Sequence, residues 1–285
     1  MRSMSALVQD WALIAFCFVC AIYFPHPVVY LVAAVVIART QLALAVLMHE
    51  SAHGVLTNKR SVNDFVGQVF TAAPLMLSMF AYRQGHMQHH RSPMASNDPV
   101  AIVFGITDYP IPRGKLAWRL LKDLTSISYF LTIRDFANGK HRALFPPVKS
   151  KPGSTALVLV SILVTNGILL GVLTTLGHAG LYVGLWILPA LTFLQVFGRI
   201  RAITEHAAYP PGEDQIKNAR TITRPSWQTF FFGPHCIHYH IEHHQYVRAP
   251  FYRLPEIHQI MKSQGILPAE NLYQGYGKVL KDVTT

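Results

Sequence analysis

Histidines in this chain of 285 residues form three closely spaced groups. The groups are one H-x-x-x-H pair and two H-x-x-H-H clusters: His49 and His53; His86, His89 and His90; and His240, His243 and His244. On a helix, positions i, i+3 and i+4 share one face, so we expect the three imidazoles of a cluster to point together at one spot. A plain hydrophobic core has no need of such groups. The eight imidazoles indicate a metal site with more than one metal ion.

The number of imidazoles limits the kind of site. A ninth histidine, His206, follows the last of four apolar segments and is expected close to the other eight. A zinc ion is satisfied by three or four ligands. Two six-coordinate ions offer about 12 positions, so nine imidazoles leave about three for water, O₂ or bridging groups. Imidazole suits iron, zinc, copper and nickel, so ligand type alone leaves the metal open.

The elements that carry these histidines are those of a membrane protein. Hydrophobic residues make up 51% of the chain and charged residues only 14%. Four apolar segments are long enough to cross a bilayer: 6–24, 28–48, 154–176 and 181–200. Residues 65–82 are also uncharged, but a crossing there would place His86 about 30 Å from His49. We therefore expect a re-entrant or interfacial segment, broken at Pro74.

The positive charges predict the orientation in the membrane. Residues 83–152 hold 11 Lys/Arg and residues 201–285 hold 9, while neither tight turn between spans contains any. By the positive-inside rule, both termini and every clustered histidine face the cytoplasm. The predicted fold is all-α within one membrane domain, residues 1–285: two hairpins of spans, the re-entrant segment and a cytoplasmic helical cap from 83–152 and 201–285. No cleavable signal is apparent, so we expect the N-terminus to be retained.

Arg39 is an unusual residue, because it interrupts the second span. An arginine at that depth is costly unless it faces protein or water. A polar group of a substrate, a structural ion pair and a helix that projects beyond the bilayer all remain possible.

The histidine motifs also resemble those of a known family. HESAH at residues 49–53, HMQHH at 86–90 and HIEHH at 240–244, in this order and between these spans, resemble the three histidine boxes of the membrane fatty acid desaturase superfamily. The segment FYRLPEIH at 251–258 is similar to the one that follows the last box in bacterial members. The resemblance implies a bacterial inner-membrane enzyme with two iron ions, or zinc as a substitute, that oxidises lipid C–H bonds with O₂.

By that resemblance the eight box histidines and His206 would bind the iron. The reaction would be desaturation of a lipid or fatty-acyl chain, with hydroxylation or ketolation of a lipid or carotenoid as the alternative. Family members often carry Asn near the last box, where this chain has Cys236 and His238, and Glu205 competes with His206 as a ligand.

Several polar residues are candidates for contacts behind the ligands. Glu50 and Glu242 lie between ligands in sequence and point off the ligand face, where each could accept the second N–H of an imidazole. Asp98 and Asn218 could do the same or serve as surface or capping residues. Glu205 and His238 complete this set.

The remaining expectations concern partners and rival functions. No haem or Fe–S cysteine signature is present, so electrons would come from a separate small acidic protein resembling ferredoxin, rubredoxin or cytochrome b5. The net charge of +11 would steer such a donor, although membrane topology and anionic lipid explain the same charge. Nucleic acid fits poorly beside a bilayer. The first box also matches the H-E-x-x-H of zinc metalloproteases, with Glu50 as base, but this leaves the other boxes unused.

Overall fold

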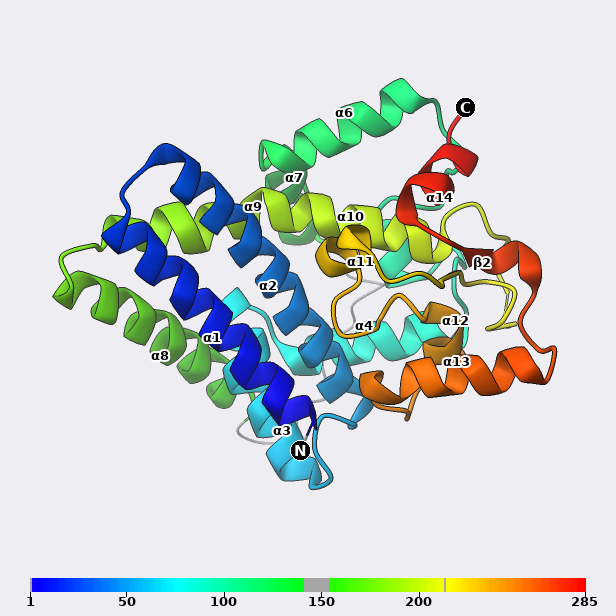
Figure 1. The fold of residues 1–285 in the computed structure, drawn as a ribbon, viewed down its shortest axis with the longest axis horizontal. Helices are drawn as coiled ribbons and strands as arrows, with labels where there is room; N and C mark the ends of the chain where they lie inside the picture. The colour runs from blue at the N-terminus through cyan, green and yellow to red at the C-terminus, as the bar shows by residue number, and fades with distance from the viewer. Residues whose placement is uncertain (1, 141–153, 213) are drawn as a thin grey trace. The chain divides into compact units, whose positions relative to one another are not determined.

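The computed structural model describes residues 2–140, 154–212 and 214–285, and its regular structure is almost entirely helical (Figure 1). The predicted all-α class is therefore confirmed. The described residues pack as two compact units, one from Met1–Tyr82 and Val148–Gln195 and the other from Arg83–Pro147 and Val196–Thr285. The second unit takes in nearly the same two stretches as the predicted cap. A single domain over residues 1–285 stays a prediction.

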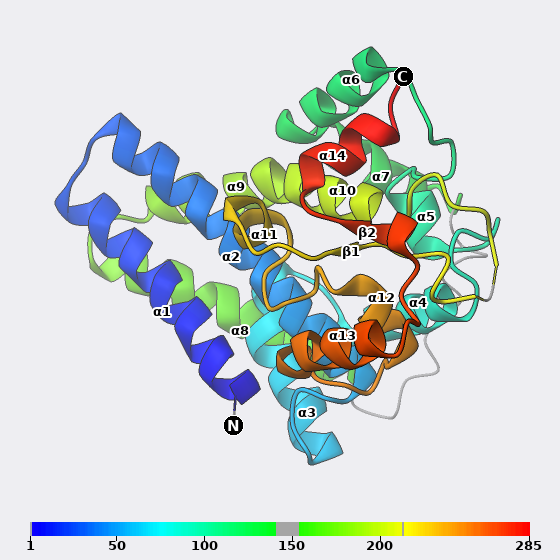
Figure 2. The same ribbon diagram turned by 45° about the vertical axis from the view of Figure 1, so that its right-hand side comes forward.

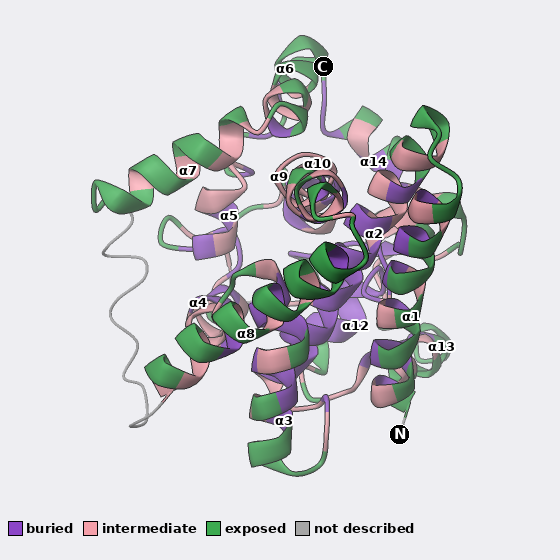
Figure 3. Cartoon of the chain, turned by 90° about the vertical axis from the view of Figure 1, so that its left-hand side faces the viewer, coloured by how far each residue is buried: buried purple, intermediate pink, exposed green. Residues whose placement is uncertain are grey.

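The first unit contains the long apolar helices. Its elements are α1 (Arg2–Tyr23), α2 (Pro27–His53), α3 (Arg60–Val66), η1 (Gly67–Ala72), η2 (Ala73–Leu75), α8 (Ser154–Thr175), η3 (Tyr182–Ile187) and α9 (Leu188–Leu191). Helix α1 packs along α2 as a hairpin (Figures 1 and 2). Helix α8 exposes most of its length (Figure 3), with Leu163 73% exposed, as expected for a helix that faces lipid.

Within the described ranges, four helical stretches are long and apolar enough to cross a membrane: α1, α2, α8 and Tyr182–His206. The four predicted spans are thus confirmed, although the second and fourth run further than expected, to His53 and His206. Helix α2 continues because nothing in its sequence stops it before Gly54, which takes φ +80° and closes the last turn through its N–H. His49 and His53 therefore lie within helix α2, and His206 lies in the last turn of the fourth span.

The predicted interruption near Pro74 is confirmed. The helical run Arg60–Leu75 is followed by a break, and α4 (Met79–Arg91) leaves it at an angle of 96°. Gln68 satisfies the backbone at this break, since its side-chain amide donates to Leu77 O at 3.2 Å and accepts from Met79 N at 3.0 Å. Such internal hydrogen bonds allow irregular backbone at membrane depth. The re-entrant course itself stays a prediction.

Arg39 forms an ion pair between the first two spans. Its Nη1 lies 3.5 Å from Asp10 Oδ1, and both side chains are nearly buried. Of the three roles considered for Arg39, the structure shows the ion pair.

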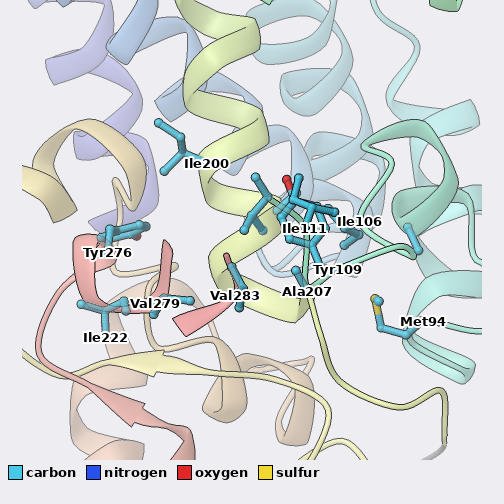
Figure 4. Close-up of a cluster of buried hydrophobic side chains, with 13 residues drawn as sticks. Met94, Ile106, Tyr109, Ile111, Ile200, Ala207, Ile222, Tyr276, Val279 and Val283 are labelled. Carbon is cyan, nitrogen blue, oxygen red and sulfur yellow. The ribbon is translucent and has the colours of Figure 1, made fainter. Parts of the chain in front are cut away.

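The second unit holds shorter elements around its own core. They are most of α4, α5 (Pro99–Val103), α6 (Arg113–Leu124), α7 (Ile127–Ala137), most of α10 (Phe193–His206), β1 (Thr221–Ile222), α11 (Trp227–Phe232), α12 (His240–Gln245), η4 (Phe251–Arg253), α13 (Leu254–Ser263), η5 (Ala269–Asn271), β2 (Leu272–Tyr273) and α14 (Tyr276–Asp282). Side chains including Ile106, Ile111, Ile200, Val279 and Val283 form a buried apolar cluster between these elements (Figure 4). The short parallel pair of β1 and β2 was not predicted from the sequence.

Candidate metal centre

The second unit brings seven histidines into two groups, and each H-x-x-H-H cluster contributes to both. His86, His90 and His243 form what we call the three-histidine group, in which Nε2–Nε2 distances are 2.9 Å for His86–His90 and 3.2 Å for His90–His243. The other four form the four-histidine group, all of them buried, with one ligand nitrogen of each within 4.8 Å of the others: His89, His206, His240 and His244.

This arrangement corrects the expectation that each cluster points at one spot. The i and i+4 side chains pair, as in His86–His90 and His240–His244, with ring centroids 4.5 and 4.6 Å apart. The i+3 ring of each cluster, His89 or His243, belongs to the other group. On a helix with 3.6 residues per turn, positions i and i+4 differ by about 40° but i+3 and i+4 by about 100°. The i and i+4 residues of one cluster can therefore contribute to one group, while the i+3 residue contributes to the other.

The first box lies in the first unit. His49 and His53 occupy the last turn of α2, with ring centroids 4.7 Å apart, so their imidazoles also gather on one face of the helix. His49 is fully buried, and Glu50 beside it is buried as well.

Outer partners hold the four-histidine group in place. The Nδ1 of His89 donates to Asp98 Oδ2 at 2.9 Å, and that of His206 donates to the main-chain oxygen of Asn218 at 2.8 Å. The Nδ1 of His244 lies 2.7 Å from Gln215 Oε1. The amide of Gln215 is fixed in this orientation, because its nitrogen donates to His90 O at 2.7 Å. Each partner thus turns an Nε2 atom toward the middle of the group.

The resulting arrangement of lone pairs calls for a cation. An imidazole whose Nδ1 donates to a carbonyl oxygen carries its proton there, so its Nε2 is a bare lone pair when the ring is neutral. Burial lowers the pKa of His240 and His244 well below the ordinary value, so both rings are neutral at pH 7. Yet His240 Nε2 lies 2.8 Å from His206 Nε2 and 3.2 Å from His244 Nε2. One Nε2–H of His240 can donate to only one of these neighbours at a time, whereas a metal ion placed among the three Nε2 atoms would accept a lone pair from each.

The nitrogen spacings fit a six-coordinate ion better than a tetrahedral one. With metal–nitrogen bonds of about 2.1 Å, neighbouring ligands lie about 3.0 Å apart in an octahedron and about 3.4 Å apart in a tetrahedron. The Nε2–Nε2 contacts, 2.8–3.2 Å in both groups, lie around the octahedral value. The donors present therefore fit metal binding, and imidazole suits iron as well as zinc, copper and nickel.

Asp98 links the ligand His89 to the local backbone. Burial, the largest single influence, would raise the pKa of its carboxyl, but the hydrogen bond and charge of His89 and the hydrogen bond from Met94 N together outweigh burial and hold that pKa below its ordinary value. The same carboxylate accepts from Met94 N at 2.8 Å and from Val100 N at 2.9 Å, which caps α5. Asp98 therefore stays ionised and fixes the tautomer of His89.

Glu242 is buried within the last box, but it binds residues outside the two histidine groups. Its Oε1 lies 2.5 Å from His258 Nδ1, and its Oε2 accepts from Thr221 Oγ1 at 2.6 Å. The same Thr221 hydroxyl accepts from Ile241 N at 3.2 Å and so caps the first turn of α12, whose own N-cap residue Tyr239 gives no side-chain bond. We call Glu242, Thr221 and His258 the α12 clamp. It fixes the short helix that carries His240, His243 and His244.

The other candidates behind the ligands lie as follows. Glu205 Oε1 is 3.4 Å from His240 Nδ1 and 2.6 Å from Arg201 Nε, so it stands behind a ligand, while its neighbour His206 points into the group. Asn218 acts through its main chain, and its side chain donates to Gly212 O. His238 Nδ1 lies 2.7 Å from Ile222 O, outside both groups.

Sequence reasoning gave no role to Gln215, Thr221 or His258. Gln215 and Thr221 lie in loop and strand far from any box, and no spacing rule connects them to the ligands. His258 offered one signal, because it ends the FYRLPEIH segment, where it lies on α13 with the exposed Glu256.

Comparison with known proteins gives the family of this chain. A sequence model of the family described as fatty acid desaturase matches residues 25–276, a range that contains all nine histidines. Dihydrorhizobitoxine desaturase of Bradyrhizobium elkanii is 28% identical over 276 residues, which cover 89% of this chain and 73% of that protein. With four helices able to cross a membrane and buried histidine groups fit for metal, this chain belongs to the fatty acid desaturase family of oxidoreductases.

Proposed function

We propose that the protein is an O₂-dependent di-iron enzyme that desaturates a lipid or fatty-acyl chain. The observation that carries the proposal is the pair of imidazole groups in the second unit, with Nε2 atoms facing one another at 2.8–3.2 Å. Family membership and the name of the curated relative, a desaturase, favour this reaction.

The proposed ligand set assigns His49 and His53 to the three-histidine group. Their shared face on α2 supports this role, as does the position of HESAH as the first of three boxes. One ion would then have five imidazoles and the other four. About three of the roughly 12 positions of two six-coordinate ions would remain for water or O₂.

The protein residues provide position and proton control. Bound iron would supply the oxidising power for an unactivated C–H bond. In the balanced reaction, two substrate hydrogens, two donor electrons and two protons reduce O₂ to two waters. Asp98, Gln215 and the Asn218 carbonyl hold Nδ1 protons and keep the Nε2 atoms available as ligands. The α12 clamp holds the short helix that carries the ligands of the last box.

The electron donor and the orientation belong to the same proposal. The 20 Lys/Arg in residues 83–152 and 201–285 support a cytoplasmic cap that attracts a small acidic redox protein. The metalloprotease alternative loses its support, because a zinc site at His49 and His53 would leave the seven imidazoles of the second unit without a role.

Mass spectrometry of lipids tests the reaction. The chain is expressed with a compatible donor in a host of defined lipid composition, beside the His243→Ala variant as a control. Products lighter by two hydrogen atoms, found only with the wild-type chain, are expected. Products heavier by one oxygen atom would show that the reaction is hydroxylation rather than desaturation. Lipids identical in both strains, with iron bound and donor present, would contradict both reactions.

A further inference from the structure

Helices α6 and α7 present a wide apolar surface to the outside of the second unit. Figure 3 shows both helices mostly exposed or half-buried, and no residue of α7 is buried. Phe130 is 59% exposed, Trp118 is 55% exposed and Leu121 is 48% exposed. We call the exposed large apolar residues of the two helices the α6–α7 face: Trp118, Leu121, Leu124, Ile127, Phe130, Leu131, Ile133 and Phe136.

The protein holds α6 in this orientation. Asp123, the buried residue of α6, accepts from Arg199 Nη2 at 2.9 Å, and Arg119 Nη1 donates to Gly105 O at 2.7 Å. Leu116 and Leu120 pack against the apolar cluster of Figure 4. These ion pairs and core contacts occupy the inner side of α6, so Trp118 stays on its exposed side. Helix α7 packs against α6, and its own large apolar residues are also exposed.

The charges around the face are mainly positive. Residues 113–140 contain six Lys/Arg and two Asp. Asp123 pairs with Arg199, Asp135 pairs with Arg134 and Lys140, and the neighbouring Asp108 pairs with Lys115 and Arg119. Arg113 and Lys122 lie outside these ion pairs. Aromatic and aliphatic residues flanked by exposed cations are typical of helices that lie in the surface of an anionic membrane.

The lengths of the helices set their orientation. At 12 and 11 residues, α6 and α7 are about 18 and 16 Å long, well short of the roughly 30 Å hydrocarbon core. They can lie along a leaflet but cannot cross the bilayer. In sequence, α7 ends at Ala137 and the next span, α8, begins at Ser154.

We propose that the α6–α7 face lies flat in the headgroup layer of an anionic leaflet. Its apolar side chains contact the upper acyl chains, and the flanking Lys and Arg bind lipid phosphates. Lipid is favoured over a protein partner because the chain already crosses a bilayer, so this surface meets lipid at high local concentration.

Tryptophan fluorescence tests the proposal on the full chain in vesicles of phosphatidylglycerol and brominated phosphatidylcholine. The difference between wild type and Trp118→Phe isolates the signal of Trp118, and Trp227→Phe gives a reference for another exposed tryptophan, 67% exposed. We expect strong quenching of Trp118 by brominated acyl chains and weak quenching by aqueous acrylamide. In a Trp118→Phe background, Phe130→Trp should be quenched by brominated lipid several-fold more than Lys140→Trp.

Two results would overturn the proposal. Quenching of Trp118 by acrylamide but not by brominated lipid would place the face in water. Protection from both quenchers would mean that protein covers it, either a second copy or another part of this chain. The charge component has its own test, because Lys122→Glu combined with Lys140→Glu is expected to weaken lipid quenching of Trp118. Unchanged quenching in that variant would contradict the role given to anionic headgroups.

Discussion

His89→Ala and His243→Ala are each expected to abolish turnover and to remove roughly half of the bound iron. His89 belongs to the four-histidine group and His243 to the three-histidine group, although each is the i+3 residue of its own box. Loss of one imidazole weakens one ion and leaves the other group complete. The combined variant should lose nearly all iron. Metal analysis of purified protein, together with a product assay, measures both effects.

His178→Ala is the matched control, because His178 lies in the turn between two spans and outside every box. It should keep full iron and full turnover. Full iron and normal turnover in both box variants would refute the ligand assignment. Complete loss of iron in each single variant would show instead that the two groups bind metal only together.

Glu242→Ala is expected to cause the largest effect of any residue outside the ligands. The substitution leaves His258 Nδ1 and the Thr221 hydroxyl without their buried acceptor, since Glu242 is fully buried. An orphaned buried polar group costs about 1–3 kcal/mol, so the free energy of unfolding should fall by about that amount or more. Displacement of α12, which carries three of the proposed ligands, should also weaken iron binding. Chemical denaturation measures the free energy of unfolding, and metal competition measures the iron affinity.

Two further variants separate the clamp from general damage. Thr221→Val removes the hydroxyl that both caps α12 and donates to Glu242, whereas Thr221→Ser keeps it. The valine variant should lose iron affinity and the serine variant should keep it. Glu256→Ala removes an exposed carboxylate two residues from His258 on the same helix and should behave as wild type. Equal iron affinity in Thr221→Val and Thr221→Ser would show that the α12 clamp does not support the metal ligands.

The membrane helices were predictable because their signal is local. Long, mostly apolar runs located the four spans found among the described residues, and Pro74 marked the break before α4. The ends were less certain, since apolar character stops at the membrane but helical hydrogen bonding continues to Gly54 and to His206.

The histidine boxes were also visible in the sequence, but their division into two groups was not. Spacing identifies residues on one face of a helix, whereas the site depends on which other helix each ring meets. His89 leaves its own cluster because α10 and α12 bring His206, His240 and His244 to it. The partners Gln215 and Thr221 come from long-range packing, for which a single sequence carries no periodic signal.

The most direct test of the proposed site is the metal content of the purified wild-type chain. The protein is produced in iron-supplied cells, extracted in mild detergent and analysed for iron, zinc and copper against protein mass. Two iron ions per chain are expected, with roughly half of that iron lost from the His89→Ala variant and from the His243→Ala variant. A single zinc ion per chain, unaffected by either substitution, would contradict a di-iron centre built from these histidines.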